Sequence, residues 1–128
     1  KYHEPLWGIE DNDWGQSVID AAKREGYRNL YKRKTGRGTE YIGYHTDGQT
    51  RPVMWSALRE AVNARQVIIP NKQGLAQFKT VIYNPKNGGR AEAVGGAHDD
   101  YPTAVAIAWQ MRKHIYAGGG VVAMGPMW

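Results

Sequence analysis

The sequence contains no cysteine, so the chain can form neither a disulfide bond nor a thiolate metal site. It also lacks an apolar run of the roughly 20 residues that a helix needs to cross a bilayer, and we expect no membrane partner. The first residues, Lys1 to Pro5, are polar and no apolar stretch follows them, so no secretory signal is recognisable. The chain does not begin with methionine, and we expect it to be part of a longer protein.

Two catalytic motifs are absent as well. No Gly-x-x-x-x-Gly-Lys-Ser/Thr segment occurs, which excludes a P-loop ATPase within these residues. No His-Glu-x-x-His segment occurs either, and together with the lack of cysteine this argues against a zinc site.

What is present suits one compact, soluble globular domain of 128 residues, with 41% hydrophobic and 23% charged residues. The 17 basic residues outnumber the 12 acidic ones and give a net charge of +5. A basic balance favours polyanionic partners, but it does not choose between DNA, RNA and an acidic protein.

Periodicity and turn residues predict an α/β chain. An apolar strand at Leu6–Ile9, a helix at 16–26 that Asn12 or Asp13 can cap, and a strand at 29–31 form a βαβ unit, whose strands should be parallel. After an extended segment at 41–44, we expect a helix at 52–64 that Gln49 or Thr50 can cap. The apolar stripe of this helix consists of Val53, Leu58, Ala61 and Val62. A third strand at 67–69, a short helix from 75 towards 81, a hairpin around the turn 84–90 and a last helix at 102–115 complete the predicted elements.

Two groups of residues could carry chemistry. Glu10 ends the first apolar strand, and His98, Asp99 and Asp100 precede the last, alanine-rich helix. Strand ends and helix starts can meet at one edge of an α/β sheet, where ligand sites gather. Magnesium prefers carboxylate oxygens, and two such ions can promote the hydrolysis of a phosphodiester. We therefore predict that Glu10 and the Asp99–Asp100 pair face one shallow cleft.

Spacing alone also allows simpler interpretations. Glu10 can be a solvated acid at a strand end, and Asp99 can be an N-cap that the helix dipole favours. His98 can be part of the turn, an interpretation that we slightly prefer to a role as ligand or proton carrier. The tryptophans at 7, 14, 55 and 109 fall in or beside predicted elements, so core packing is the expected role rather than base stacking.

A family resemblance changes this weighting. Residues 10–15 read Glu-x-Asn-x-x-Gly after an apolar strand, and residues 95–100 read Gly-x-x-His-Asp-Asp before a helix rich in alanine. In this order and separation, the two motifs resemble the nuclease domain of the terminase large subunit of tailed bacteriophages. The segment 43–46 and the helix after Pro52 are similar to the middle of that domain. The resemblance covers roughly residues 6 to 116. The segment 117–128 has three consecutive glycines near its start, and we expect it to be a flexible tail.

The resemblance implies a ribonuclease-H-like fold, a mixed sheet flanked by helices, and an endonuclease that cuts concatemeric double-stranded DNA during genome packaging. In the family, three acidic positions hold two Mg²⁺ or Mn²⁺ ions. Glu10 matches the second position and Asp99 or Asp100 the third, with His98 beside them. The first position should lie upstream of Lys1, so we expect the first strands of the fold to be missing and this chain to cut DNA poorly.

The resemblance also implies partners and a location. They are the terminase small subunit, the portal protein and an ATPase domain upstream in the same polypeptide, all in the cytoplasm of the bacterial host. The alternative is a non-catalytic module of the same fold that binds DNA or the portal. Because the absence of the first strand would leave an open edge beside Leu6–Ile9, we expect self-association or cover from the tail.

Several basic residues could contact DNA phosphates without reading sequence. A basic, glycine-containing loop at 32–39 is as well explained by solvation as by DNA binding. The turn at 84–90 is a weaker candidate. The residues concerned are Lys32, Arg33, Lys34, Arg37, Lys86 and Arg90.

Overall fold

The computed structural model describes residues 3–84, 90–93 and 98–117. Four helices and four short strands are present in this part of the chain. In chain order they are α1 (Gly15–Arg24), β1 (Lys32–Lys34), β2 (Glu40–Ile42), α2 (Thr50–Asn63), α3 (Lys72–Thr80), β3 (Val81–Asn84), β4 (Arg90–Ala93) and α4 (Asp100–Ala117).

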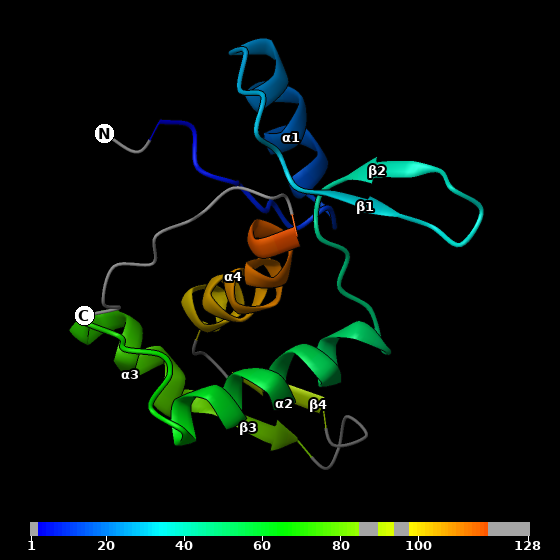
Figure 1. Ribbon diagram of the computed structural model, residues 1–128. Helices are drawn as coiled ribbons and strands as arrows, with labels where there is room; N and C mark the ends of the chain where they lie inside the picture. The colour runs from blue at the N-terminus through cyan, green and yellow to red at the C-terminus, as the bar shows by residue number, and fades with distance from the viewer. Residues whose placement is uncertain (1–2, 85–89, 94–97, 118–128) are drawn as a thin grey trace.

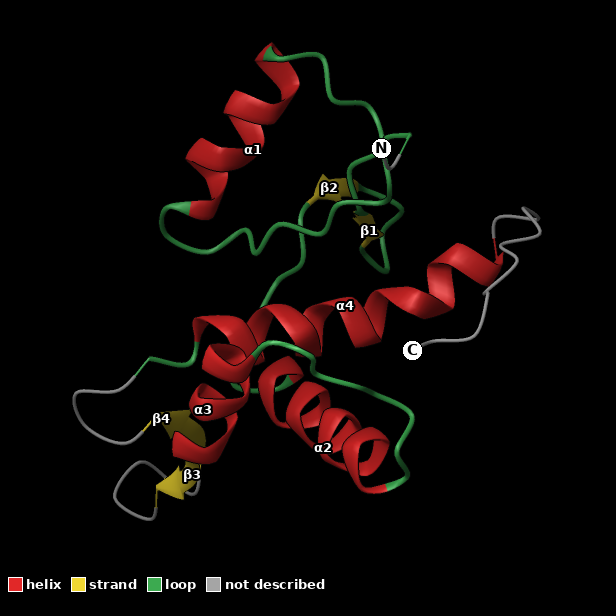
Figure 2. Cartoon of the chain, turned by 90° about the vertical axis from the view of Figure 1, so that its left-hand side faces the viewer, coloured by secondary structure: helices red, strands yellow, loops and turns green. Residues whose placement is uncertain are grey.

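The chain is a mixture of helix and sheet, as predicted, but its strands do not join into one mixed sheet. Within the described residues, β1 pairs with β2 and β3 pairs with β4, each pair antiparallel. The second pair is the expected hairpin, in which Val81 lies opposite Ala93. The helix α4 crosses the molecule, with α1 and the β1–β2 hairpin on one side and α2 and α3 on the other (Figures 1 and 2).

The first apolar segment is extended, and its partners are those of a βαβ unit. Trp7 and Leu30 form a parallel bridge, as predicted, and Glu10 forms a second parallel bridge with Tyr44. The backbone hydrogen bonds of Trp7, Ile9 and Asp11 all lie on one edge of this extended segment, because the backbone groups of alternate residues in a strand point to the same side. On the other edge, Gly8 and Glu10 have no backbone partner among the described residues.

Two cores hold these elements. One is formed by Ile9, Ile19, Ala22 and Leu30, which attach α1 to the extended segments. The larger one joins α2 to α4 through Met54, Trp55, Leu58, Ala106, Ile107 and Met111, and it also includes Tyr31.

Three local predictions are wrong. No strand forms at 67–69, because Ile68 is 58% exposed and the segment has no partner strand in the described chain. The predicted loop at 32–39 contains β1, which pairs in register with β2. The stripe predicted for α2 is wrong only in part: Leu58 and Ala61 are buried as predicted, but Met54 and Trp55 are buried in place of Val53, which is 64% exposed, and Val62, which is 38% exposed. Helix periodicity locates a buried face only to within about one residue when apolar residues adjoin it.

The ends of the helices show how side chains replace missing backbone partners. Asn71 caps α3 by accepting from the backbone N–H groups of Gln73 and Gly74. We predicted that Asn12 or Asp13 caps α1, but the N-cap residue of this helix is Trp14, whose side chain makes no capping hydrogen bond. No helix in the described part of the chain is long and apolar enough to cross a bilayer.

Candidate active site

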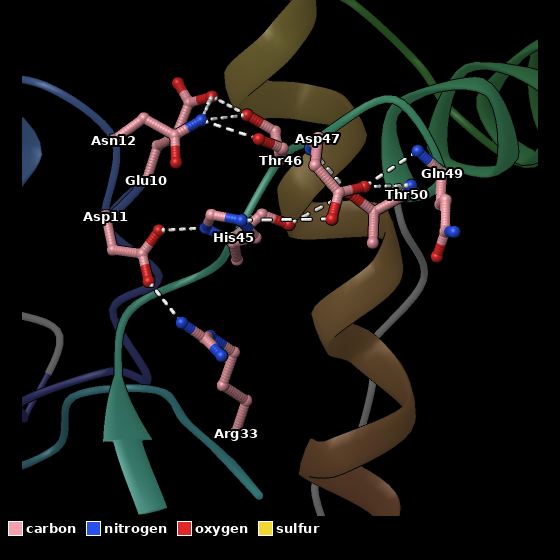
Figure 3. A network of polar contacts seen from close by, with 9 residues as sticks. All are labelled: Glu10, Asp11, Asn12, Arg33, His45, Thr46, Asp47, Gln49 and Thr50. Carbon is pink, nitrogen blue, oxygen red and sulfur yellow. Dashed lines mark hydrogen bonds and ion pairs between the residues drawn. The ribbon is translucent and has the colours of Figure 1, made fainter. Parts of the chain in front are cut away.

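Glu10 is held at the end of the first extended segment by contacts from a distant part of the chain. Its Oε1 accepts a hydrogen bond from the hydroxyl of Thr46 (Figure 3). The amide of Asn12 lies 3.4 Å from the same oxygen. Because both contacts use Oε1, Oε2 has no hydrogen-bond partner among the described residues and is available to a ligand.

Asn12 connects the two segments that carry this contact. Its Nδ2 donates to the Thr46 carbonyl at 2.7 Å and lies 2.6 Å from the Thr46 hydroxyl oxygen, across 34 residues of sequence. Thr46 is only 8% exposed, so these bonds are shielded from competing water. Asn12 therefore orients Glu10 through Thr46 as well as directly.

Gly15 completes the turn after Glu10. A Cβ at this position would lie 1.6 Å from the carbonyl oxygen of Glu10, closer than any side chain allows. The N–H of Gly15 donates to the carbonyl of Asn12 at 2.8 Å. The pattern Glu-x-Asn-x-x-Gly at 10–15 thus has a physical basis here: the acid, the amide that orients it, and the glycine that permits the close turn.

Asp11 points the opposite way and belongs to a second network. One of its oxygens accepts from Arg33 Nη2 at 2.8 Å, and the other lies 2.8 Å from His45 Nδ1 (Figure 3). Burial of the carboxylate by itself raises the pKa of Asp11, but the hydrogen bonds and charges of Arg33 and His45 outweigh burial, and the pKa lies below its ordinary value. Asp11 is a structural anion rather than a free ligand.

Asp47 continues this network to the start of α2. Its Oδ1 accepts from the backbone N–H groups of Thr50 and Gln49 at 2.7 and 2.8 Å, and these bonds lower the pKa of Asp47. Asp47 therefore does the capping that we predicted for Gln49 or Thr50. His45 Nε2 is 3.8 Å from the Asp47 carboxylate, so His45 lies between two acids.

The acids before α4 differ in their surroundings. Asp99 accepts from Arg51 Nη2 at 2.8 Å, and both side chains are about three-quarters buried, with exposed fractions of 26% and 27%. Asp100 is 89% exposed; its carboxylate lies 4.0 Å from Nδ1 of His98, which is itself 80% exposed. Such an exposed contact contributes little, so His98 and Asp100 are both free to meet a ligand.

Glu10 and Asp100 line the same cleft, which has a volume of about 740 Å³. Arg51 lines it too, whereas its partner Asp99 does not. The other lining residues are Ile9, Asn12, Asp13, Trp14, Gly15, Thr46, Asp47, Gly48 and Pro52. Of the predicted acids, the structure therefore brings Glu10 and Asp100 to one cleft and directs Asp99 to Arg51.

The donor set of this cleft is chemically suited to a hard cation, since carboxylate and amide oxygens are the ligands of Mg²⁺. It is small, however. Among residues 3–84, 90–93 and 98–117 there is no group of three or more acidic or histidine side chains close enough to share an ion. A metal at this cleft would depend on Glu10, Asp100 and water, or on a further ligand.

The basic residues are placed unequally. Arg33 turns inward to Asp11 and also lies over the ring of Tyr41, 4.8 Å from its centroid. Lys34 is 3.7 Å from Glu40 and mostly exposed. Lys32 and Arg37 are exposed. Lys86 and the side chain of Arg90 lie outside the described residues.

Several residues of the site escaped sequence analysis. Thr46 and Arg51 lie in no motif that we assigned to chemistry, and only tertiary contacts connect them to Glu10 and Asp99. Asn12 belongs to the Glu-x-Asn-x-x-Gly pattern, and this pattern was the sequence feature that pointed to it. Trp14, expected to pack in the core, is 84% exposed at the rim of the cleft.

Comparison of the chain with protein-family models, with curated proteins and with solved structures yields no match.

Proposed function

We propose that this chain is part of a Mg²⁺- or Mn²⁺-dependent endonuclease domain with a ribonuclease-H-like fold, as in the terminase large subunits that its motifs resemble. The observation that carries the proposal is that Glu10 and Asp100 line one cleft although 89 residues lie between them in the sequence. One comes from the end of an extended segment and the other from the start of a helix, and ligand sites in α/β folds gather outside the carboxyl ends of strands.

Each residue has a distinct role in this proposal. Glu10 and Asp100 hold the cation, and the bond from Thr46 leaves one Glu10 oxygen free for it. Asp99 positions Arg51, whose guanidinium faces the phosphate of the substrate and balances its charge. When bound, the ions would supply an activated water and neutralise the charge that develops on the leaving oxygen.

The substrate and partners follow from the resemblance and from charge. A net charge of +5 attracts DNA, and contacts to phosphates position a duplex without selecting sequence. The substrate would be concatemeric double-stranded DNA in the bacterial cytoplasm. The terminase small subunit, the portal and an upstream ATPase domain would be the protein partners.

Calorimetric titration with Mn²⁺ and a plasmid-nicking assay test the proposal together. We expect Glu10→Gln and Asp100→Asn each to weaken Mn²⁺ binding at least tenfold, while Glu25→Gln, an exposed acid at the end of α1, leaves it unchanged. The 128-residue chain should nick poorly, and a longer version that includes the upstream residues of its gene should nick well. Loss of nicking in the longer version with either cleft variant supports the proposal.

The second candidate is a module that binds DNA or the portal without cutting. Four acids line the cleft, Glu10, Asp13, Asp47 and Asp100, but no three acidic or histidine side chains in the described part of the chain are close enough to share an ion, which favours this candidate. Failure of both the short and the long version to nick plasmid in Mg²⁺ and in Mn²⁺, with DNA binding retained, would replace the nuclease by the binding module.

A further inference from the structure

Trp14 is the most exposed large hydrophobic side chain that the structure describes, at 84%, and it stands at the rim of the cleft. The other partly exposed tryptophan at this end of the chain, Trp7, is 42% exposed and packs edge-on against Tyr27 with ring centroids 5.3 Å apart. A tryptophan ring left in water forgoes the burial of a large apolar surface. An aromatic ring left open beside a polar cleft is suited to stacking against a flat ligand.

The backbone below Trp14 is firmly placed. Asp13 has a positive φ of 45°, and Gly15 lies so close to the Glu10 carbonyl that no side chain fits between them. The N–H of Gly15 also donates to the Asn12 carbonyl, so the turn that carries Trp14 is tied to the residues that hold Glu10. The ring is therefore attached at a fixed point relative to the proposed ligands.

Arg51 lines the same cleft and supplies a cation. Its bond to Asp99 uses one of the five N–H donors of a guanidinium, and the guanidinium carbon lies 5.8 Å from the ring centroid of Trp55. These two contacts orient the group and leave donors for an incoming oxyanion. The cleft thus offers an aromatic face and a positioned cation together, in the same lining as Glu10 and Asp100.

We propose that the cleft binds a single unpaired nucleotide of DNA, with its base stacked on Trp14 and its phosphate at Arg51. The inference rests on the proposed nuclease function and specifies its substrate: DNA that is single-stranded, frayed or locally opened at the site. A side chain can stack on a base only when that base has left its own stack. A cleft of about 740 Å³ is within the usual range of roughly 300–1,000 Å³ for small-ligand sites, so one nucleotide can enter it.

The test is fluorescence anisotropy with labelled oligothymidylate and with a blunt duplex of equal length, in Ca²⁺ and at fixed salt. We expect Trp14→Ala to weaken oligothymidylate binding about 5- to 100-fold, the range that stacking of one base supports, and duplex binding less than about twofold. Trp14→Phe should keep most of the affinity. Val18→Ala, which removes an exposed apolar side chain one turn along α1 and outside the cleft, should change neither.

A second readout separates stacking from general attraction. Oligothymidylate should quench the tryptophan fluorescence of the parent chain and of Val18→Ala, and most of this quenching should disappear in Trp14→Phe. Arg51→Ala should lower the slope of log affinity against log salt by about 0.7 for the single strand, as expected for one lost phosphate contact.

The possible failures are distinguishable. Equal affinities for oligothymidylate in the parent chain and Trp14→Ala, or equal losses with both DNA forms, overturn the nucleotide subsite, even if Glu10→Gln and Asp100→Asn abolish Mn²⁺ binding and the nuclease proposal stands. Selective loss of single-strand binding in Trp14→Ala, with no effect of the acid variants on metal binding or nicking, keeps the subsite but assigns it to a binding module. If only a protein partner depends on Trp14, the subsite is likewise rejected.

Discussion

Arg51 lies 2.8 Å from Asp99 and forms an ion pair with it across 48 residues of sequence. This pair separates two acids that are adjacent in the chain, because Asp99 is occupied by the guanidinium while Asp100 stays exposed at the cleft. Stability and ligand binding should therefore respond to different members of the His-Asp-Asp triplet.

Asp99→Asn should destabilise the fold by about 1–2 kcal/mol, since it leaves the partly buried Arg51 without a counter-charge. Asp100→Asn should cost less than about 0.5 kcal/mol because its side chain is exposed. Urea denaturation measures both. Arg51→Gln should match Asp99→Asn, and the double variant should lose less than the sum of the two. Additive losses would show that the two residues do not interact in solution.

The contact of Thr46 with Asn12 and Glu10 should be energetically important because Thr46 is buried. Thr46→Val keeps the shape of the side chain but leaves the Asn12 amide and the Glu10 carboxylate short of a partner, so we expect a loss of about 1–3 kcal/mol. Thr46→Ser, which retains the hydroxyl, is the matched control and should lose much less. Chemical denaturation of the two variants decides the matter: a Thr46→Val chain as stable as the parent would show that the hydroxyl contributes nothing.

Gly15 should not tolerate any side chain. Gly15→Ala introduces a Cβ against the Glu10 carbonyl, and we expect it to cost at least about 3 kcal/mol or to displace the turn. Gly36→Ala is the control, because nothing lies within 4 Å of the position that a Cβ would take there and its φ is not in the strained range. Thermal unfolding should separate the variants by many degrees; a Gly15→Ala chain as stable as the parent would contradict the close approach.

Asp11 should make stability depend on pH on the acid side. Its pKa is lowered in the folded chain, so its contribution is complete above the unfolded-state pKa of about 3.9 and is lost as pH falls through the lower folded value. Asp11→Asn should therefore lower the free energy of unfolding by about 1–3 kcal/mol at pH 7 and flatten its dependence on pH below about 4. Asp20→Asn, which changes an exposed acid on α1, is the control and should alter the free energy of unfolding at pH 7 by less than about 0.5 kcal/mol.

Among the basic residues of the β1–β2 hairpin, those that point to solvent should dominate the salt dependence of DNA binding. Replacing Lys32, Lys34 and Arg37 together by alanine should reduce the slope of log affinity against log salt for a duplex by up to about 2.7, which is about 0.9 for each phosphate contact. Arg33→Ala should instead lower stability, because Arg33 is bound to Asp11. An unchanged slope in the triple variant would remove the hairpin from the DNA interface.

The sequence alone predicted those elements whose structure depends on residues close together in the chain. The helix α1 and the hairpin of β3 and β4 follow from periodicity and turn residues within a few positions. The parallel bridge of Trp7 to Leu30 could also be predicted, since a short helix between two strands leaves that geometry as the natural one. The acids Glu10 and Asp100 were recognisable because they follow a strand and precede a helix.

Only the tertiary structure decided how those elements and acids are used. The segment 67–69 has the composition of a strand, but a strand needs a partner and none lies beside it in the described chain. Trp14 is a large hydrophobic residue, of the kind that usually packs in a core, but the turn at Gly15 directs it to solvent. Asp99 and Asp100 are chemically identical, and only the approach of Arg51 from 48 residues away distinguishes the one that is neutralised from the one that is free.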